Sequence, residues 1–147
     1  MNQKTISEKF WQQNSTSHSI STWRGFAFEN VCFNHIDEIK YALGISGVIT
    51  EVSMWLKKED DREGLQIDLL IRRNDNVINM CEIKFYNRPF QVNKEYYSQI
   101  LTRESILSEM ISKRTAIHST LITTFGLVNN EYSSAFLNTI VLDDLFK

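Results

Sequence analysis

Two apolar runs rich in β-branched residues, on either side of a short polar turn, constrain the fold of this chain more than any other feature. The runs span 66–73 and 77–85, and the turn between them is Asn74-Asp75-Asn76. Asn and Asp favour tight turns because their side chains hydrogen-bond to nearby backbone and tolerate left-handed conformations. The pattern therefore predicts an antiparallel hairpin closed by these turn residues.

The loop length sets which residues face each other across the hairpin. If Asn74-Asp75-Asn76 is the whole loop, Arg73 pairs with Val77, and the same register places Asp68 opposite Glu82. Directly opposed residues have Cβ atoms roughly 5 Å apart. Two carboxylates at that separation repel each other unless a proton or a cation lies between them.

Strand alternation adds a base to this pair of acids. Glu82 and Lys84 share one face of their strand, and Ile83 takes the other. The residues around Asp68 and Glu82 are apolar, and buried charges need partners or a metal. Since carboxylate oxygens suit Mg²⁺ or Mn²⁺, Asp68 and Glu82 are candidate metal ligands and Lys84 is a candidate catalytic residue. The alternative is a structural Asp/Glu/Lys cluster that closes one end of the sheet.

The remaining elements predict an α/β domain around a mixed sheet. We expect a polar tail or linker over 1–20 and a domain over 21–147. Strands are expected at 48–56, 66–73, 77–85, 118–125 and 139–142, and long helices at 21–43, ending near Gly44, and 93–112. A short helical or irregular stretch is expected at 132–137, a closing helical turn at 143–146, and a charged loop at 57–63.

Glu29 lies among apolar residues on the first predicted helix. It follows Phe26 by three positions and precedes Phe33 by four, a spacing that places them on one helix face. A carboxylate there is expected to face the sheet, as a further metal ligand or as a partner of the metal ligands. A capping or salt-bridge role is an equal alternative.

Composition narrows the class of protein. The net charge is −2 and the pI about 5.9, which disfavours a free-standing nucleic-acid binder, although a bound cation or another subunit can supply positive charge. No apolar run reaches the roughly 18 residues of a membrane span, and no signal peptide is visible. Cys32 and Cys81 are not in a C-x-x-C spacing, so a cytoplasmic setting is expected.

Three segments carry a resemblance to a known family. The segments 23–29 (WRGFAFE), 66–71 (QIDLLI) and 79–85 (NMCEIKF) resemble the PD-(D/E)-x-K nuclease superfamily. More narrowly, they resemble the nuclease-like C-terminal domain of bacterial AAA-type ATPases of the archaeal-ATPase-like group. The closing segment 142–146 (LDDLF) fits as well, and the likeness covers nearly the whole chain.

The resemblance implies a restriction-endonuclease-like αβββαβ core with a central mixed sheet flanked by helices. Asp68 and Glu82 would bind Mg²⁺ or Mn²⁺, and Lys84 would orient or deprotonate the attacking water. Glu29 would match the acidic residue of the first helix, and Lys94 a basic position near the phosphate. The proline that gives the superfamily its name is absent, and Ile67 stands in its place.

The favoured function is that of a metal-dependent hydrolase that cleaves phosphodiester bonds in DNA. The resemblance implies an ATPase domain or subunit, in cis or in trans, as a partner. The chain has no phosphate-binding Gly-x-x-x-x-Gly-Lys-Ser/Thr loop, so it is not expected to be the ATPase itself but a domain of a longer protein or a stand-alone relative. A homo-oligomer is also compatible with the sequence. The alternatives are an inactive nuclease-fold module for nucleic-acid binding or assembly, and a toxin- or defence-linked effector activated by its ATPase.

Overall fold

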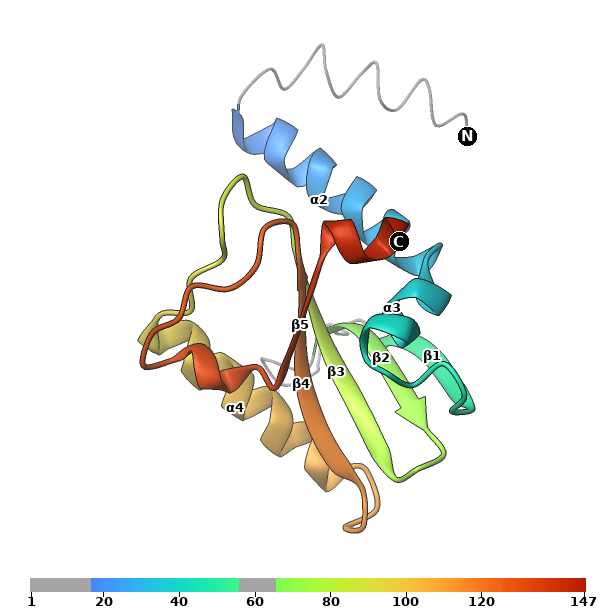
Figure 1. The fold of residues 1–147 in the computed structure, drawn as a ribbon. Helices are drawn as coiled ribbons and strands as arrows, with labels where there is room; N and C mark the ends of the chain where they lie inside the picture. The colour runs from blue at the N-terminus through green and yellow to red at the C-terminus, as the bar shows by residue number, and fades with distance from the viewer. Residues whose placement is uncertain (1–16, 56–65) are drawn as a thin grey trace, which may run out of the picture.

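A five-stranded mixed sheet, in the order β1-β2-β3-β4-β5, forms the centre of the molecule (Figure 1). The computed structural model describes residues 17–55 and 66–147. The β1–β2 and β2–β3 pairs are antiparallel, and the β3–β4 and β4–β5 pairs are parallel. The strands are β1 (Thr50–Trp55), β2 (Ile67–Arg73), β3 (Val77–Lys84), β4 (Ala116–Thr123) and β5 (Asn138–Val141). The expected α/β class and mixed sheet are confirmed.

Helices cover both faces of this sheet (Figure 1). The long helix α4 packs on one face, while α2, α3 and the C-terminal turn η2 lie on the other. The helices are α2 (Ser17–Phe33), α3 (Ile36–Ala42) and α4 (Lys94–Glu109), with 3₁₀ turns η1 (Ser133–Ala135) and η2 (Leu142–Phe146). The η2 turn was expected from the sequence, and η1 falls in the stretch expected to be helical or irregular.

The single helix predicted over 21–43 was wrong in two respects. It is two helices, because the chain turns at Asn34-His35 between α2 and α3. Helix α2 also begins at Ser17, inside the segment expected to be a tail. The predicted end is confirmed, since Gly44 takes a left-handed φ of 75° just after α3, the conformation that favours glycine at a helix C-terminus.

The predicted hairpin register is confirmed. Leu69 pairs with Cys81 and Arg72 with Ile78, which is the register set by the Asn74-Asp75-Asn76 loop. Asn76 closes that loop with a φ of 64°, a left-handed conformation that Asn tolerates better than most residues. The turn chemistry therefore fixes which side chains face each other along β2 and β3.

Two hydrophobic clusters sandwich the sheet. On the α2 side the buried residues include Cys32, Leu69 and Cys81. The α4 side is built from the alternate positions of the same strands, such as Leu70 and Met80. Because β2 and β3 are buried on both faces, any charge they carry within the sheet must find a partner inside the protein.

Helix α4 is the crossover between the parallel strands β3 and β4, as such a pairing requires. The side chain of Asn93 caps its N-terminus by accepting a bond from the Tyr96 N–H at 2.8 Å. Ile100 and Leu107 are fully buried against the sheet. Leu101, the residue after Ile100, is 44% exposed and therefore lies off this buried face.

Some predictions lie outside the described residues. These are the charged loop over 57–63 and most of the tail, 1–16. Within the described ranges, none of the helices combines the length and hydropathy that a membrane crossing needs. Cys32 and Cys81 are both buried and free, and burial raises the pKa of the Cys32 thiol to about 12, which makes it a poor nucleophile.

Candidate functional site

Glu82 is a buried carboxylate in the middle strand of the sheet. Its side chain is 3% exposed, and it lies on the face covered by α4. Arg103 Nη1 donates to Glu82 Oε1 at 2.5 Å, and the Tyr96 hydroxyl donates to the same oxygen at 3.1 Å. Burial raises the pKa of Glu82 above its usual range, although the Arg103 charge opposes that rise.

Asp68 lies where β2 and β3 stop pairing as a regular ladder. Its Oδ2 accepts a bond from the Ile83 backbone N–H at 2.9 Å. The β1–β2 pairing shifts register beside this point, and Ile67 and Leu70 both pack on the α4 side. Strict alternation would put those two residues on opposite faces, so β2 is irregular at Asp68. Such irregularities re-aim side chains near functional sites.

Lys84 ends β3 two positions beyond Glu82. Its Nζ lies 5.3 Å from the centre of the Tyr96 ring. The side chains of Lys84 and Glu82 therefore both point toward α4. The Thr123 hydroxyl donates to the Lys84 carbonyl at 2.7 Å, which ties the ends of β3 and β4 together. The predicted common face for Glu82 and Lys84 is therefore observed.

Glu29 of α2 approaches this end of the sheet from the other side. Burial raises the pKa of Glu29, the charge of Asp68 raises it further, and the charge of Lys84 lowers it. Glu82 feels the charges of Asp68 and Lys84 in the same senses. The charges of Asp68 and Lys84 thus act on both Glu29 and Glu82.

The side chains that surround Glu29 on α2 differ from those expected. Phe26, expected in the buried stripe, is 62% exposed, and Trp23 is also exposed. Over residues 23–33, the part of α2 whose side chains are described, the buried positions are Phe28 and Cys32. Glu29 is half-buried beside that stripe, close enough to the sheet to couple to Asp68 and Lys84.

Lys94 and the aromatic residues that follow Lys84 differ in their exposure. Lys94 is the exposed first residue of α4, two positions before Tyr96. Phe85 and Tyr86, which directly follow Lys84, are both exposed, whereas Phe90 is buried. Phe90 is thus a core residue.

Arg103 and Tyr96 are the site residues that sequence reasoning missed. A signal was present, because Tyr96, Ile100, Arg103 and Leu107 recur at the spacing of one helix face. A charge within such a stripe is expected to face the sheet.

The donor atoms at this end of the sheet fit a divalent cation. Glu82 Oε2 is buried and has no hydrogen-bond partner among the described residues. An unpaired buried oxygen costs about 1–3 kcal/mol, a cost that a bound cation would offset. Across 17–55 and 66–147, no three His, Cys, Asp or Glu side chains are grouped as a metal cage. Mg²⁺ is commonly held by one or two carboxylates plus water and substrate phosphate, which Asp68 and Glu82 can supply.

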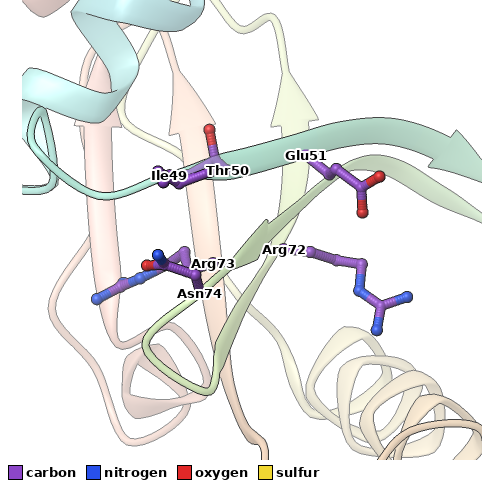
Figure 2. A pocket seen from close by; sticks show the side chains of 6 residues that line it. All are labelled: Ile49, Thr50, Glu51, Arg72, Arg73 and Asn74. Carbon is purple, nitrogen blue, oxygen red and sulfur yellow. The ribbon is translucent and has the colours of Figure 1, made fainter.

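A shallow pocket lies at the opposite end of β2, near the hairpin turn (Figure 2). Its volume is about 270 Å³, and it contains none of the four charged residues above. Glu51 and Arg72, which pair across β1 and β2, extend from its wall. Opposite charges already face each other there, so this pocket does not compete with the carboxylate site as the chemical centre.

Comparison with known proteins gives a distant likeness to a solved structure. No protein-family model matches the chain, and no curated protein matches it. A crystal structure described as "Protein of Unknown Function AF1548" superposes with a TM-score of 0.46 at 14% sequence identity. The match covers 75% of this chain and 56% of that one, so this chain spans little more than half of that structure.

Proposed function

We propose that this domain is a Mg²⁺- or Mn²⁺-dependent phosphodiesterase of the DNA endonuclease type, on a restriction-endonuclease-like αβββαβ fold. The observation that supports it best is the buried, unpaired Oε2 of Glu82, close to the charges of Asp68 and Lys84. The mixed sheet with helices on both faces is compatible with that fold. The resemblance of the three sequence segments to PD-(D/E)-x-K nucleases supports the same proposal.

In this proposal the acidic residues bind the metal ion, and the lysines interact with the phosphate. Asp68 and Glu82 would hold the ion, and Glu29 would add negative charge from α2. When bound, such an ion polarises a phosphate oxygen and lowers the pKa of a bound water. The Lys84 ammonium offsets the negative charge that develops on the phosphate during attack. Lys94, exposed at the start of α4, offers a cation to a neighbouring phosphate of the strand.

Metal binding is the first test. Stepwise addition of Mn²⁺ or Mg²⁺ should raise the melting temperature, because an ion that binds only the folded state stabilises it. The Asp68→Asn and Glu82→Gln variants should lose this shift, whereas Glu51→Gln, which faces Arg72 near the hairpin turn at the other end of β2, should keep it. Isosteric changes are preferable to alanine, since Glu82→Ala would leave Arg103 buried without its partner.

Cleavage is the second test. Wild-type protein should nick plasmid DNA with Mg²⁺ and stop when a chelator is added. Lys84→Met should slow nicking about 10²-fold or more, the usual contribution of such a group. A folded Asp68→Asn protein that nicks at the wild-type rate would contradict the assignment.

The rival proposal is an inactive module that binds nucleic acid or assembles with a partner. The net charge of −2 favours it, because nucleases that grip a backbone usually have a basic surface. Metal binding without nicking, by this chain alone and by a full-length protein with its ATPase, would select the rival. Nicking only in the presence of the ATPase would instead indicate an effector that its partner activates.

A further inference from the structure

The two oxygens of the Glu82 carboxylate are in unequal surroundings. Oε1 accepts hydrogen bonds from Arg103 Nη1 at 2.5 Å and from the Tyr96 hydroxyl at 3.1 Å. Oε2 is buried and accepts none from the residues that the structure describes. Both hydrogen bonds that α4 donates to the Glu82 carboxylate therefore go to the same oxygen, Oε1.

Arg103 makes less of this contact than its chemistry allows. A guanidinium commonly binds a carboxylate through two parallel N–H bonds, one to each oxygen. Here one bond forms, and Arg103 Nε is itself buried without a partner in the described part of the chain. A two-bond pair would have occupied Glu82 Oε2. The single bond leaves that oxygen outside the ion pair.

The helix holds Arg103 firmly in this arrangement. Ile100 and Leu107, one turn to either side on the same face, are fully buried. Glu104 accepts a bond from the Ser119 hydroxyl of β4 at 2.5 Å, which fastens the same turn of α4 to the sheet. These contacts fix the position of the α4 backbone from which the Arg103 side chain reaches Glu82.

We propose that Arg103 is a positioning residue for the metal-binding carboxylate: with Tyr96 it holds Oε1 of Glu82 and so reserves Oε2 for a divalent cation. This inference rests on the function proposed above and names a residue outside the Asp68, Glu82 and Lys84 set. Partners that orient ligating carboxylates commonly account for 10–100-fold of metal affinity.

The test is the Mn²⁺ dissociation constant of metal-free protein, measured by calorimetry. Arg103→Lys keeps the positive charge but loses the planar guanidinium, and Tyr96→Phe removes the other donor while keeping the ion pair. We expect Mn²⁺ binding to weaken roughly 10-fold or more in Arg103→Lys, and measurably in Tyr96→Phe. Arg114→Lys, the same change at an exposed position beyond α4, is the matched control and should bind as wild type does. Circular dichroism and thermal melting establish that each variant is folded.

Three results would overturn the proposal. Unchanged Mn²⁺ affinity in folded Arg103→Lys would make Arg103 a structural counter-charge only. Tighter binding would make it a competitor that occupies the metal ligand. A wild-type protein that binds no Mn²⁺ would remove the metal site and the proposed function together, which distinguishes that failure from the first two. If Arg103→Lys does not fold, Tyr96→Phe decides: weaker binding supports the proposal, and unchanged binding overturns it.

Discussion

Asp68 Oδ2 accepts a hydrogen bond from the backbone N–H of Ile83 at 2.9 Å. The first acid of the site is thereby fastened to the strand that carries the second, at the point where regular pairing of β2 and β3 stops. The bond satisfies a backbone donor at the edge of the ladder and fixes the carboxylate beside Glu82. The Asp68 carboxylate is thus held against the β3 backbone, one residue along the strand from Glu82.

Removing the buried acid should destabilise the fold. Glu82→Ala leaves the Arg103 guanidinium buried without its partner, and breaking a buried ion pair from one side costs about 3–5 kcal/mol. Glu82→Gln retains an oxygen acceptor and should cost less. Urea denaturation followed by circular dichroism measures both. Equal, near-zero changes for the two variants would mean that the ion pair does not form in solution.

The stability of the metal-free protein should depend on pH through Glu29. Its pKa is raised in the folded state, first by burial and then by the Asp68 charge, so folding favours the protonated form. The resulting penalty is absent well below the ordinary value of 4.5 and appears as the pH rises above it. Glu29→Gln should therefore be more stable than wild type at pH 7, and the gain should vanish at low pH.

A matched measurement separates this effect from a general change of charge. Glu51→Gln on β1 alters the net charge equally, far from Asp68, and should not show the same gain. Urea melts of both variants from pH 3.5 to pH 8, without metal, give the comparison. Should Glu29→Gln lose stability at pH 7, the interpretation of Glu29 as an acid crowded by Asp68 is wrong.

The start of α4 offers a third prediction, through its cap. Asn93 accepts a bond from the Tyr96 N–H, and replacing an N-cap Asn with Ala typically costs about 1 kcal/mol. Asn93→Asp and Asn93→Ser keep a capping oxygen and should stay close to wild type. Thermal melting distinguishes them. A loss shared equally by all three variants would point to a contact other than the cap.

The hairpin turn offers a fourth. Asn76 has a φ of 64°, where a β-branched residue is strained, so Asn76→Val should lose about 1–2 kcal/mol. Asn76→Gly should be close to neutral, because glycine adopts that conformation freely. The free energy of unfolding from urea titrations tests both. A tolerated valine would show that the loop can rearrange without disturbing the register.

The sequence was most informative where local chemistry sets the geometry. The Asn74-Asp75-Asn76 turn fixes the hairpin register, and with it the pairing of β2 and β3 near Asp68 and Glu82. It was least informative where the outcome depends on tertiary packing. The break between α2 and α3 falls at Asn34-His35, with neither glycine nor proline to mark it.

The site could be predicted in part for the same reason. Glu82 and Lys84 follow from strand alternation, a purely local rule. The irregularity of β2 at Asp68 depends on how β1 and β2 pair. No local sequence pattern predicts that pairing. Arg103 was predictable in principle from its helical spacing with Ile100 and Leu107. Its partner on β3 was not, because that contact requires the crossover to be docked on the sheet.

The parallel pairing of β3 and β4 has a consequence for how the buried charge is tolerated. To pair in parallel, the chain must leave the sheet after Lys84, travel back along one face and re-enter at Ala116. The return path contains α4, and α4 carries Arg103, the positively charged residue that pairs with Glu82. A chain with that connection detached would keep the hairpin and both acids but have nothing to neutralise the inner one. Lengthening or shortening the return path would therefore change the chemistry of the acids while leaving the strand that bears them untouched.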